Sequence, residues 1–181
     1  RAQEVQAAIQ RIREIETELE AKERSSTLYQ KGMNLNERQL YEDSMSVFEQ
    51  AYKVYPDYKI LRGIGSAAIG LKKYSLAVSA YERYLREGES KISSATAIRI
   101  EKLIETLKRK EELSLKREES LEHFKTGMNL RTQGAYQEAI DEYQQAYDIL
   151  PSYKIHFSIA KANASLKNYD EAGQSYERFL E

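Results

Sequence analysis

The sequence predicts an all-α fold, a helix-turn-helix solenoid in which similar units stack on one another. Residues 23–86 align with residues 118–181 without a gap, at a shift of 95, and 24 of the 64 aligned positions are identical. A shorter period of 33 residues lies inside each copy and relates, for example, Phe48 to Tyr81. Only 2 prolines and 8 glycines occur in 181 residues, so helix breakers are rare. Self-similarity at these periods is typical of stacked helical folds, which usually bind rather than catalyse.

Residues 120–152 show the repeating unit most clearly. The pattern predicts one helix up to a break at Gly134 and a second helix that ends before Pro151. Proline cannot continue a helix, because it lacks the backbone N–H and its ring clashes with the preceding turn. Ala139 and Ala146 share one face of the second helix, where small side chains let neighbouring helices approach closely.

At these residues the chain resembles the tetratricopeptide repeat family, whose members repeat about every 34 residues with small residues, aromatic residues and a late proline at fixed places. The family pattern is closely matched by the run from Gly134 to Ile140, followed by Tyr143, Ala146 and Pro151. Other repeats match it at Tyr74, Ala77, Tyr81, Tyr169, Ala172 and Tyr176. The first repeat departs from it, with Gln39 in place of the turn glycine and Ser44 in place of the small alanine. The resemblance implies four repeats in two pairs, near residues 25–57, 58–86, 120–152 and 153–181.

Two stretches outside the repeats are also expected to be helical. Residues 1–24 and 96–119 occupy equivalent places in the 95-residue unit, and neither contains glycine or proline. We expect residues 87–119 to be a linker that caps the first repeat pair, and residues 1–24 to be a cap or linker from an upstream unit. The expected capping side chains are Ile98, Leu103, Ile104 and Leu107, with Ile9, Ile12 and Ile15 in the upstream cap. The expected domains are therefore residues 1–24, 25–86, 87–119 and 120–181.

One long helix is expected across the linker and the first helix of the second pair, because no residue between Ala95 and Arg131 forces a break. A straight helix would hold the two repeat pairs apart as separate modules. A kink near Ser114 or Ser120 would instead let them stack into one superhelix. The sequence leaves both arrangements open.

Composition narrows the possible functions. The 28 basic and 29 acidic residues give a net charge of −1, which argues against general binding to nucleic acid or acidic membranes. There is no cysteine, so disulfides and thiolate metal sites are excluded, and no apolar run approaches the roughly 20 residues that span a bilayer. Because the chain begins with arginine rather than methionine, we expect it to be part of a longer protein.

No constellation of catalytic or metal-binding residues is recognisable. Gly63, Gly65 and Gly70 lie in an expected helix with no preceding strand, so helix packing explains them better than a phosphate loop. His123 and His156, the only histidines, occupy equivalent repeat positions where the first copy has leucine, which indicates packing roles. We therefore expect no enzyme activity, no cofactor and no bound metal.

The family resemblance implies a groove on the first helices of the repeats, where members of the family contact extended or helical peptides. Carried over by repeat register, the groove positions are Tyr29, Met33, Asn36, Arg62, Ser66 and Ile69 in the first copy, and Phe124, Met128, Arg131, Phe157, Lys161 and Ala164 in the second. Aromatic residues and arginine are enriched at binding hot spots, and methionine suits adaptable surfaces. The alternative is that these aromatic residues pack against the linker helix or a neighbouring pair. The lysine–asparagine clamp by which some members grip chaperone carboxylates is absent, since the matching positions hold aromatic residues and methionines.

We therefore expect a non-enzymatic scaffold for protein–protein interaction that holds a partner protein or peptide in one or both grooves. The alternative hypothesis is a structural protein whose 95-residue units self-assemble, as a homo-oligomer, into a larger complex or array. Neither nucleic-acid binding nor direct membrane insertion is expected. The Pro-x-Tyr-Lys-Ile turns are similar to those of repeat proteins common in bacteria, many of them in the cell envelope. This similarity favours a soluble bacterial protein of the envelope or periplasm over a cytoplasmic one.

Overall fold

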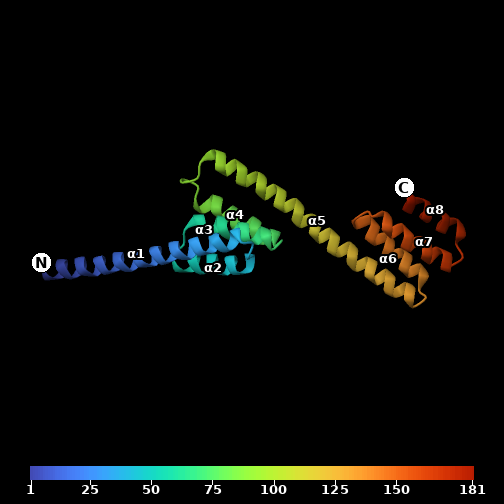
Figure 1. Cartoon of the computed structure of the whole chain (residues 1–181), viewed down its shortest axis with the longest axis horizontal. Helices are drawn as coiled ribbons and strands as arrows, with labels where there is room; N and C mark the ends of the chain where they lie inside the picture. The colour runs from blue at the N-terminus through green and yellow to red at the C-terminus, as the bar shows by residue number, and fades with distance from the viewer. The chain divides into compact units, whose positions relative to one another are not determined.

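The computed structural model describes all residues from 1 to 181 and contains only helices (Figure 1). The all-α prediction is therefore confirmed. The chain divides into two compact units, Arg1–Lys110 and Glu111–Glu181. The helices are α1 (Ala2–Glu37), α2 (Tyr41–Val54), α3 (Tyr58–Gly70), α4 (Tyr74–Glu87), α5 (Ser94–Thr132), α6 (Tyr136–Ile149), α7 (Tyr153–Ser165) and α8 (Tyr169–Leu180).

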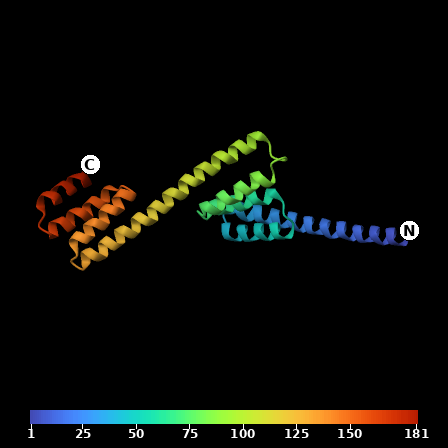
Figure 2. The same ribbon diagram turned by 180° about the vertical axis from the view of Figure 1, so that it is seen from behind.

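Within each unit, helices that follow one another in the chain pack side by side. In the first unit α1 packs on α2, α2 on α3 and α3 on α4, and α1 also reaches α3. In the second unit α6 packs on α7 and α7 on α8, as the view from behind in Figure 2 also shows. This is the helix-turn-helix repeat that the sequence predicts. The proposed domain boundaries at residues 24, 86 and 119 stay a prediction.

The turns between the two helices of each repeat share one backbone conformation. Gln39, Lys72 and Lys167 have φ of 62°, 58° and 64°, and Gly134 has φ of 82°. Glycine adopts this left-handed region without the steric cost that other residues carry. Gln39 stands at the position equivalent to Gly134, so the first repeat keeps the turn geometry although it lacks the turn glycine.

A buried aromatic ring forms the centre of each unit. Phe48 is fully buried on α2 and lies between α1 and α3. A Cβ atom placed on Gly32 or Gly63 would come within 2.6 Å of the Phe48 ring. Tyr143 takes the same place in the second unit, where a Cβ on Gly127 would lie 2.8 Å from its ring. The helix-packing interpretation of the glycines is thus confirmed at Gly63.

Residues 94–110 of α5 cap the first unit. Ile100, Ile104 and Leu107 are buried and belong to the same apolar cluster as the core of the repeats, with Leu103 partly buried beside them. The prediction was wrong for Ile98, which is 52% exposed. The stripe at i, i+4 and i+7 begins at Ile100, and Ile98 lies two residues earlier, on the opposite side of the helix.

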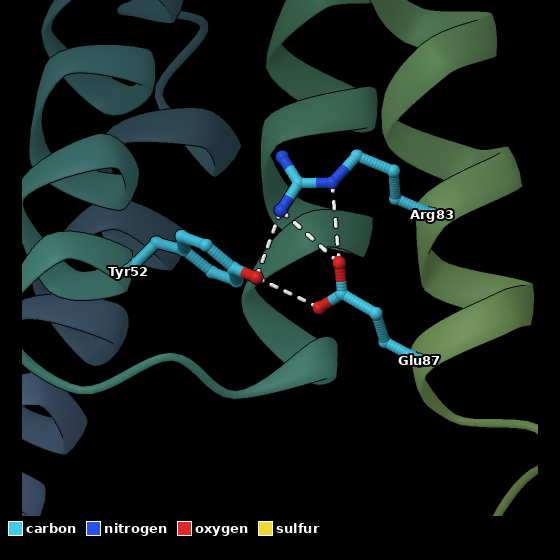
Figure 3. A network of polar contacts seen from close by, with 3 residues as sticks. All are labelled: Tyr52, Arg83 and Glu87. Atoms are coloured by element: carbon cyan, nitrogen blue, oxygen red, sulfur yellow. Dashed lines mark hydrogen bonds and ion pairs between the residues drawn. The ribbon is translucent and has the colours of Figure 1, made fainter.

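A polar network joins the second helices of the first two repeats (Figure 3). The Tyr52 hydroxyl donates a hydrogen bond to Oε2 of Glu87 at 2.7 Å and accepts one from Nη2 of Arg83 at 2.8 Å. Arg83 also pairs with Oε1 of Glu87 at 3.1 Å, and its guanidinium lies 5.0 Å from the centre of the Tyr52 ring. Burial, followed by the hydrogen bond to Glu87, raises the pKa of Tyr52, so its hydroxyl keeps the proton that it donates. The network ties α2 to α4 through side chains that are not among the predicted groove residues.

Candidate binding groove

A cleft of about 260 Å³ lies in the first unit between α1, α3 and α5. Five predicted groove residues lie together along it, namely Tyr29, Met33, Asn36, Arg62 and Ser66. The remaining wall consists of Gly63, Tyr81, Thr96, Arg99 and Ile100. The contribution of α5 was missed because residues 87–119 were interpreted only as a cap. Arg99 immediately precedes Ile100 in the capping stripe, and this adjacency is the signal that places it beside the groove.

An incompletely satisfied amide sits in this cleft. Nδ2 of Asn36 donates a hydrogen bond to Oγ of Ser66 at 3.1 Å, while its Oδ1 is buried without a hydrogen-bond partner. The two orientations of an asparagine amide are interchangeable with respect to Ser66, whose hydroxyl both donates and accepts. In either orientation one amide atom is left buried without a partner, which costs about 1–3 kcal/mol.

The cleft carries positive charge that no carboxylate in the structure neutralises. Arg62 and Arg99 are both exposed, and neither takes part in an ion pair. Tyr81 also lines this cleft. Burial raises the pKa of its phenol, and the positive charge of Arg62 partly opposes this shift. Two free guanidinium groups in a half-enclosed cleft favour a carboxylate or another planar anion.

A second cleft of about 260 Å³ is also lined by Tyr29. Lys22 and Lys59 line this cleft too, and Asp57 is its one acidic residue. The Asp57 carboxylate is engaged as a helix cap, since it accepts a hydrogen bond from the backbone N–H of Lys59 at 2.8 Å. Tyr29 is therefore the wall shared by two clefts along α1 and α3, both with a basic rim.

The predicted groove residues of the second unit make different contacts. Phe124 is half-buried against Tyr143, with ring centres 5.3 Å apart, so its ring is partly core. Phe157 is 38% exposed, and Nζ of Lys161 lies 4.7 Å from the centre of its ring. Met128 is 44% exposed and Arg131 is half-buried. The exposed pair Phe157 and Lys161 gives this unit an aromatic and cationic surface that differs from the cleft of the first unit.

The two histidines have distinct environments. His123 is half-buried, and its Nδ1 lies 2.7 Å from Oε2 of Glu142. His156 is 6% exposed and packs on the Tyr147 ring at 4.5 Å, while its Nδ1 is buried without a partner. Burial lowers the pKa of His156, the nearby Arg178 lowers it further, and Glu181 partly opposes both. The packing role predicted for His156 is consistent with this position.

Replacing His156 by leucine, the residue at the equivalent buried position Leu61, should remove a pH dependence of the second unit. A lowered pKa means that the unfolded chain binds the proton more tightly than the folded chain does. The free energy of unfolding is therefore highest above the unfolded pKa of about 6.5, and it falls as the pH drops below that value. We expect the melting temperature of the unchanged protein to fall from pH 7.5 to pH 5.5 more than that of His156→Leu, as measured by circular dichroism. Parallel pH profiles for the two proteins would contradict this assignment.

A profile of the family described as Tetratricopeptide repeat matches residues 29–92 and 124–181, which together form more than half of the chain. The chain belongs to the tetratricopeptide repeat family. The matches begin at Tyr29 and Phe124, two residues that are 95 positions apart, so the profile and the internal duplication agree on the register of the repeats. The resemblance predicted from the sequence is thereby confirmed.

Solved structures that match the chain share little sequence identity with it. MamA (41-end) from Desulfovibrio magneticus RS-1 is 16% identical, with 86% of this chain and 73% of that chain covered and a TM-score of 0.34. MamA from AMB-1 is 20% identical, with 87% and 90% covered and a TM-score of 0.34. The TPR2AB domain of yeast Sti1, in complex with pHSP90, is 12% identical, with 86% and 76% covered and a TM-score of 0.36. None of the curated proteins matches the chain significantly.

Two further properties bear on the kind of site. No helix combines the length and the apolar character needed to cross a membrane. No group of three or more histidine, cysteine, aspartate or glutamate side chains is placed to hold a metal ion.

Proposed function

We propose that this protein is a non-enzymatic interaction scaffold that binds a partner peptide or protein through the groove of its first unit. One observation carries the proposal: five residues predicted from repeat register, Tyr29, Met33, Asn36, Arg62 and Ser66, line a single cleft. Tetratricopeptide repeats are typically interaction modules, so a site on the first helices of the repeats agrees with the family.

The chemistry of the cleft indicates an acidic peptide. Arg62 and Arg99 supply two unpaired guanidinium groups, and a carboxylate can accept two parallel hydrogen bonds from each. Tyr29 and Met33 add aromatic and adaptable apolar surface beside these polar groups. The ligand that fits is a peptide with an acidic side chain next to an apolar one.

The second unit is proposed to bind a different ligand. Its groove positions replace Arg62 by Phe157 and Ser66 by Lys161, and these two side chains stack on each other. The exchange moves the positive charge from the place of Arg62 to Lys161 and adds an exposed ring, and Arg131 takes the place of Asn36, so an acidic ligand with an aromatic or aliphatic anchor should be favoured.

Selection from a random-peptide display library tests the proposal, because the enriched sequences report which side chains the cleft prefers. The immobilised full chain should enrich peptides with aspartate or glutamate beside an apolar residue. The double variant Arg62→Glu, Arg99→Glu should lose these peptides, because it reverses the charge of the cleft while both positions are exposed.

A matched control places the same charge change elsewhere. Arg86 on α4 and Arg109 on α5 are exposed and outside the cleft, so the double variant Arg86→Glu, Arg109→Glu should enrich the same peptides as the unchanged protein. Equal enrichment of acidic peptides by all three proteins would show that the cleft arginines do not hold them, whereas an equal loss in both variants would indicate general charge attraction. Either result would refute the groove assignment.

A further inference from the structure

The first turns of α1 carry an apolar stripe that nothing in the structure covers. Val5, Ile9 and Ile12 are 59%, 39% and 55% exposed. They are spaced at i, i+4 and i+7 and therefore share one face of the helix. Large β-branched residues repeated on one open face are the usual sign of a surface that is buried against a partner.

The internal duplication identifies what kind of surface this stripe fits. A shift of 95 places Val5, Ile9 and Ile12 on Ile100, Ile104 and Leu107 of α5. Those three α5 residues are 7%, 7% and 1% exposed, because they cap the apolar cluster of the first repeat pair. The start of α1 thus carries a capping sequence in the same register, but its own cap residues are uncovered.

The second unit presents the complementary open face. Tyr176 is the counterpart of Tyr81, and the two side chains are 36% and 4% exposed. Leu180 is the counterpart of Leu85, which is packed against the first core, whereas Leu180 is 81% exposed. Phe157, whose ring contacts that of Tyr176, is 38% exposed. The side of α7 and α8 that corresponds to the capped side of α3 and α4 is therefore apolar and open.

The charged residues beside the capping stripe correspond between the two copies in the same way. In the first unit Nζ of Lys108 on α5 pairs with Oε1 of Glu82 on α4 at 2.8 Å. The shift of 95 relates Lys108 to Arg13 and Glu82 to Glu177, so both signs are retained. Arg13 and Glu177 are exposed, and neither forms an ion pair within the chain. The open stripe and the open face therefore match in apolar spacing and in the position of one ion pair.

We propose that a second copy of this chain covers the open face: residues 5–13 of one copy cap α7 and α8 of the next, as residues 100–108 cap α3 and α4 within the first unit. The contact joins different surfaces of the two copies, so it is head-to-tail and propagates into a row or closes into a ring. This association goes beyond peptide binding in the first-unit cleft and uses none of that cleft's basic residues.

Sedimentation velocity over a hundredfold range of concentration tests the proposal, with two matched variants of the full chain. Ile12→Glu changes a predicted cap residue, whereas Ile15→Glu changes a neighbour of similar exposure whose counterpart, Lys110, is exposed. The unchanged protein and Ile15→Glu should exceed the monomer mass of 21.0 kDa as concentration rises. Ile12→Glu should associate at least about tenfold more weakly, since the burial of one isoleucine is worth that factor or more.

Thiol cross-linking locates the contact independently, because the natural chain has no cysteine. A mixture of Arg13→Cys and Glu177→Cys proteins should be joined by a short bismaleimide reagent. A mixture of Arg24→Cys and Glu177→Cys proteins should not, because Arg24 lies outside the capping segment. A monomer at every concentration, equal behaviour of Ile12→Glu and Ile15→Glu, or equal cross-linking of the two mixtures would each overturn the proposal.

Discussion

Replacing Phe48 by alanine should lower the free energy of unfolding of the first unit by about 3–5 kcal/mol, the usual cost of deleting a buried aromatic side chain. The ring is fully buried on α2 and is contacted from both sides by neighbouring helices. Its loss leaves a cavity that the glycine-lined surfaces of α1 and α3 have no side chains to fill. Chemical denaturation followed by circular dichroism should show the loss.

Two comparisons make this result specific. Phe48→Leu keeps most of the apolar volume and should cost clearly less than Phe48→Ala. The unfolding of the second unit, whose core is built around Tyr143, should be unchanged in both variants. A Phe48→Ala protein as stable as the unchanged one would mean that the ring does not hold the first unit together.

Replacing Gly63 by alanine should cost about 1–3 kcal/mol, although alanine is normally the better helix former. Gly63 lies within α3, and an added Cβ would meet the Phe48 ring at 2.6 Å. The ring cannot move away, because on α1 Gly32 approaches it equally closely. The strain of overpacking therefore outweighs the gain in helix propensity.

Gly173 provides the opposite case in the same chain. It lies within α8, and nothing is within 4 Å of an added Cβ. Gly173→Ala should stabilise the protein by up to about 1 kcal/mol, because it gains helix propensity without a clash. Paired urea denaturation curves measure both variants. If Gly63→Ala and Gly173→Ala shift the urea midpoint in the same direction, the close approach of α3 to the Phe48 ring does not determine the cost of the Gly63 substitution.

Local chemistry explains why so much of the fold was predictable. Pro151 and Gly134 mark where helices must end or turn, and α6 begins and ends between them as expected. Ala139 and Ala146 are both fully buried, as their shared helical face predicts. Turn residues and small buried residues act over a few positions of the chain, so a single sequence reveals them.

The candidate site was less predictable because part of it comes from outside the repeat pattern. Register placed Tyr29 and Arg62 at one cleft, but Arg99 reaches that cleft only because α5 returns over α3 and α4. Such a return depends on packing at long range, which periodicity does not encode. Ile98 was misplaced for a related reason, since an apolar residue at a helix start does not by itself indicate which face of the helix is buried.

The second copy shows that substitutions between the two copies limit what the repeat register can predict. Phe157 and Lys161 occupy the places of Arg62 and Ser66, and their mutual stacking could not be inferred from either copy alone. His156 similarly replaces Leu61 in a core position and introduces a titratable group there. Duplication therefore predicts where such side chains lie, while the contacts they make depend on which substitutions occur together.

Isothermal titration of one selected acidic peptide tests the central claim, that the first-unit cleft binds the partner, most directly. The dissociation constant should rise at least about tenfold for Arg62→Ala, because a charge-assisted hydrogen bond is lost. It should stay unchanged for Arg86→Ala, which removes an exposed arginine outside the cleft. Equal dissociation constants for Arg62→Ala, Arg86→Ala and the unchanged protein would contradict the account.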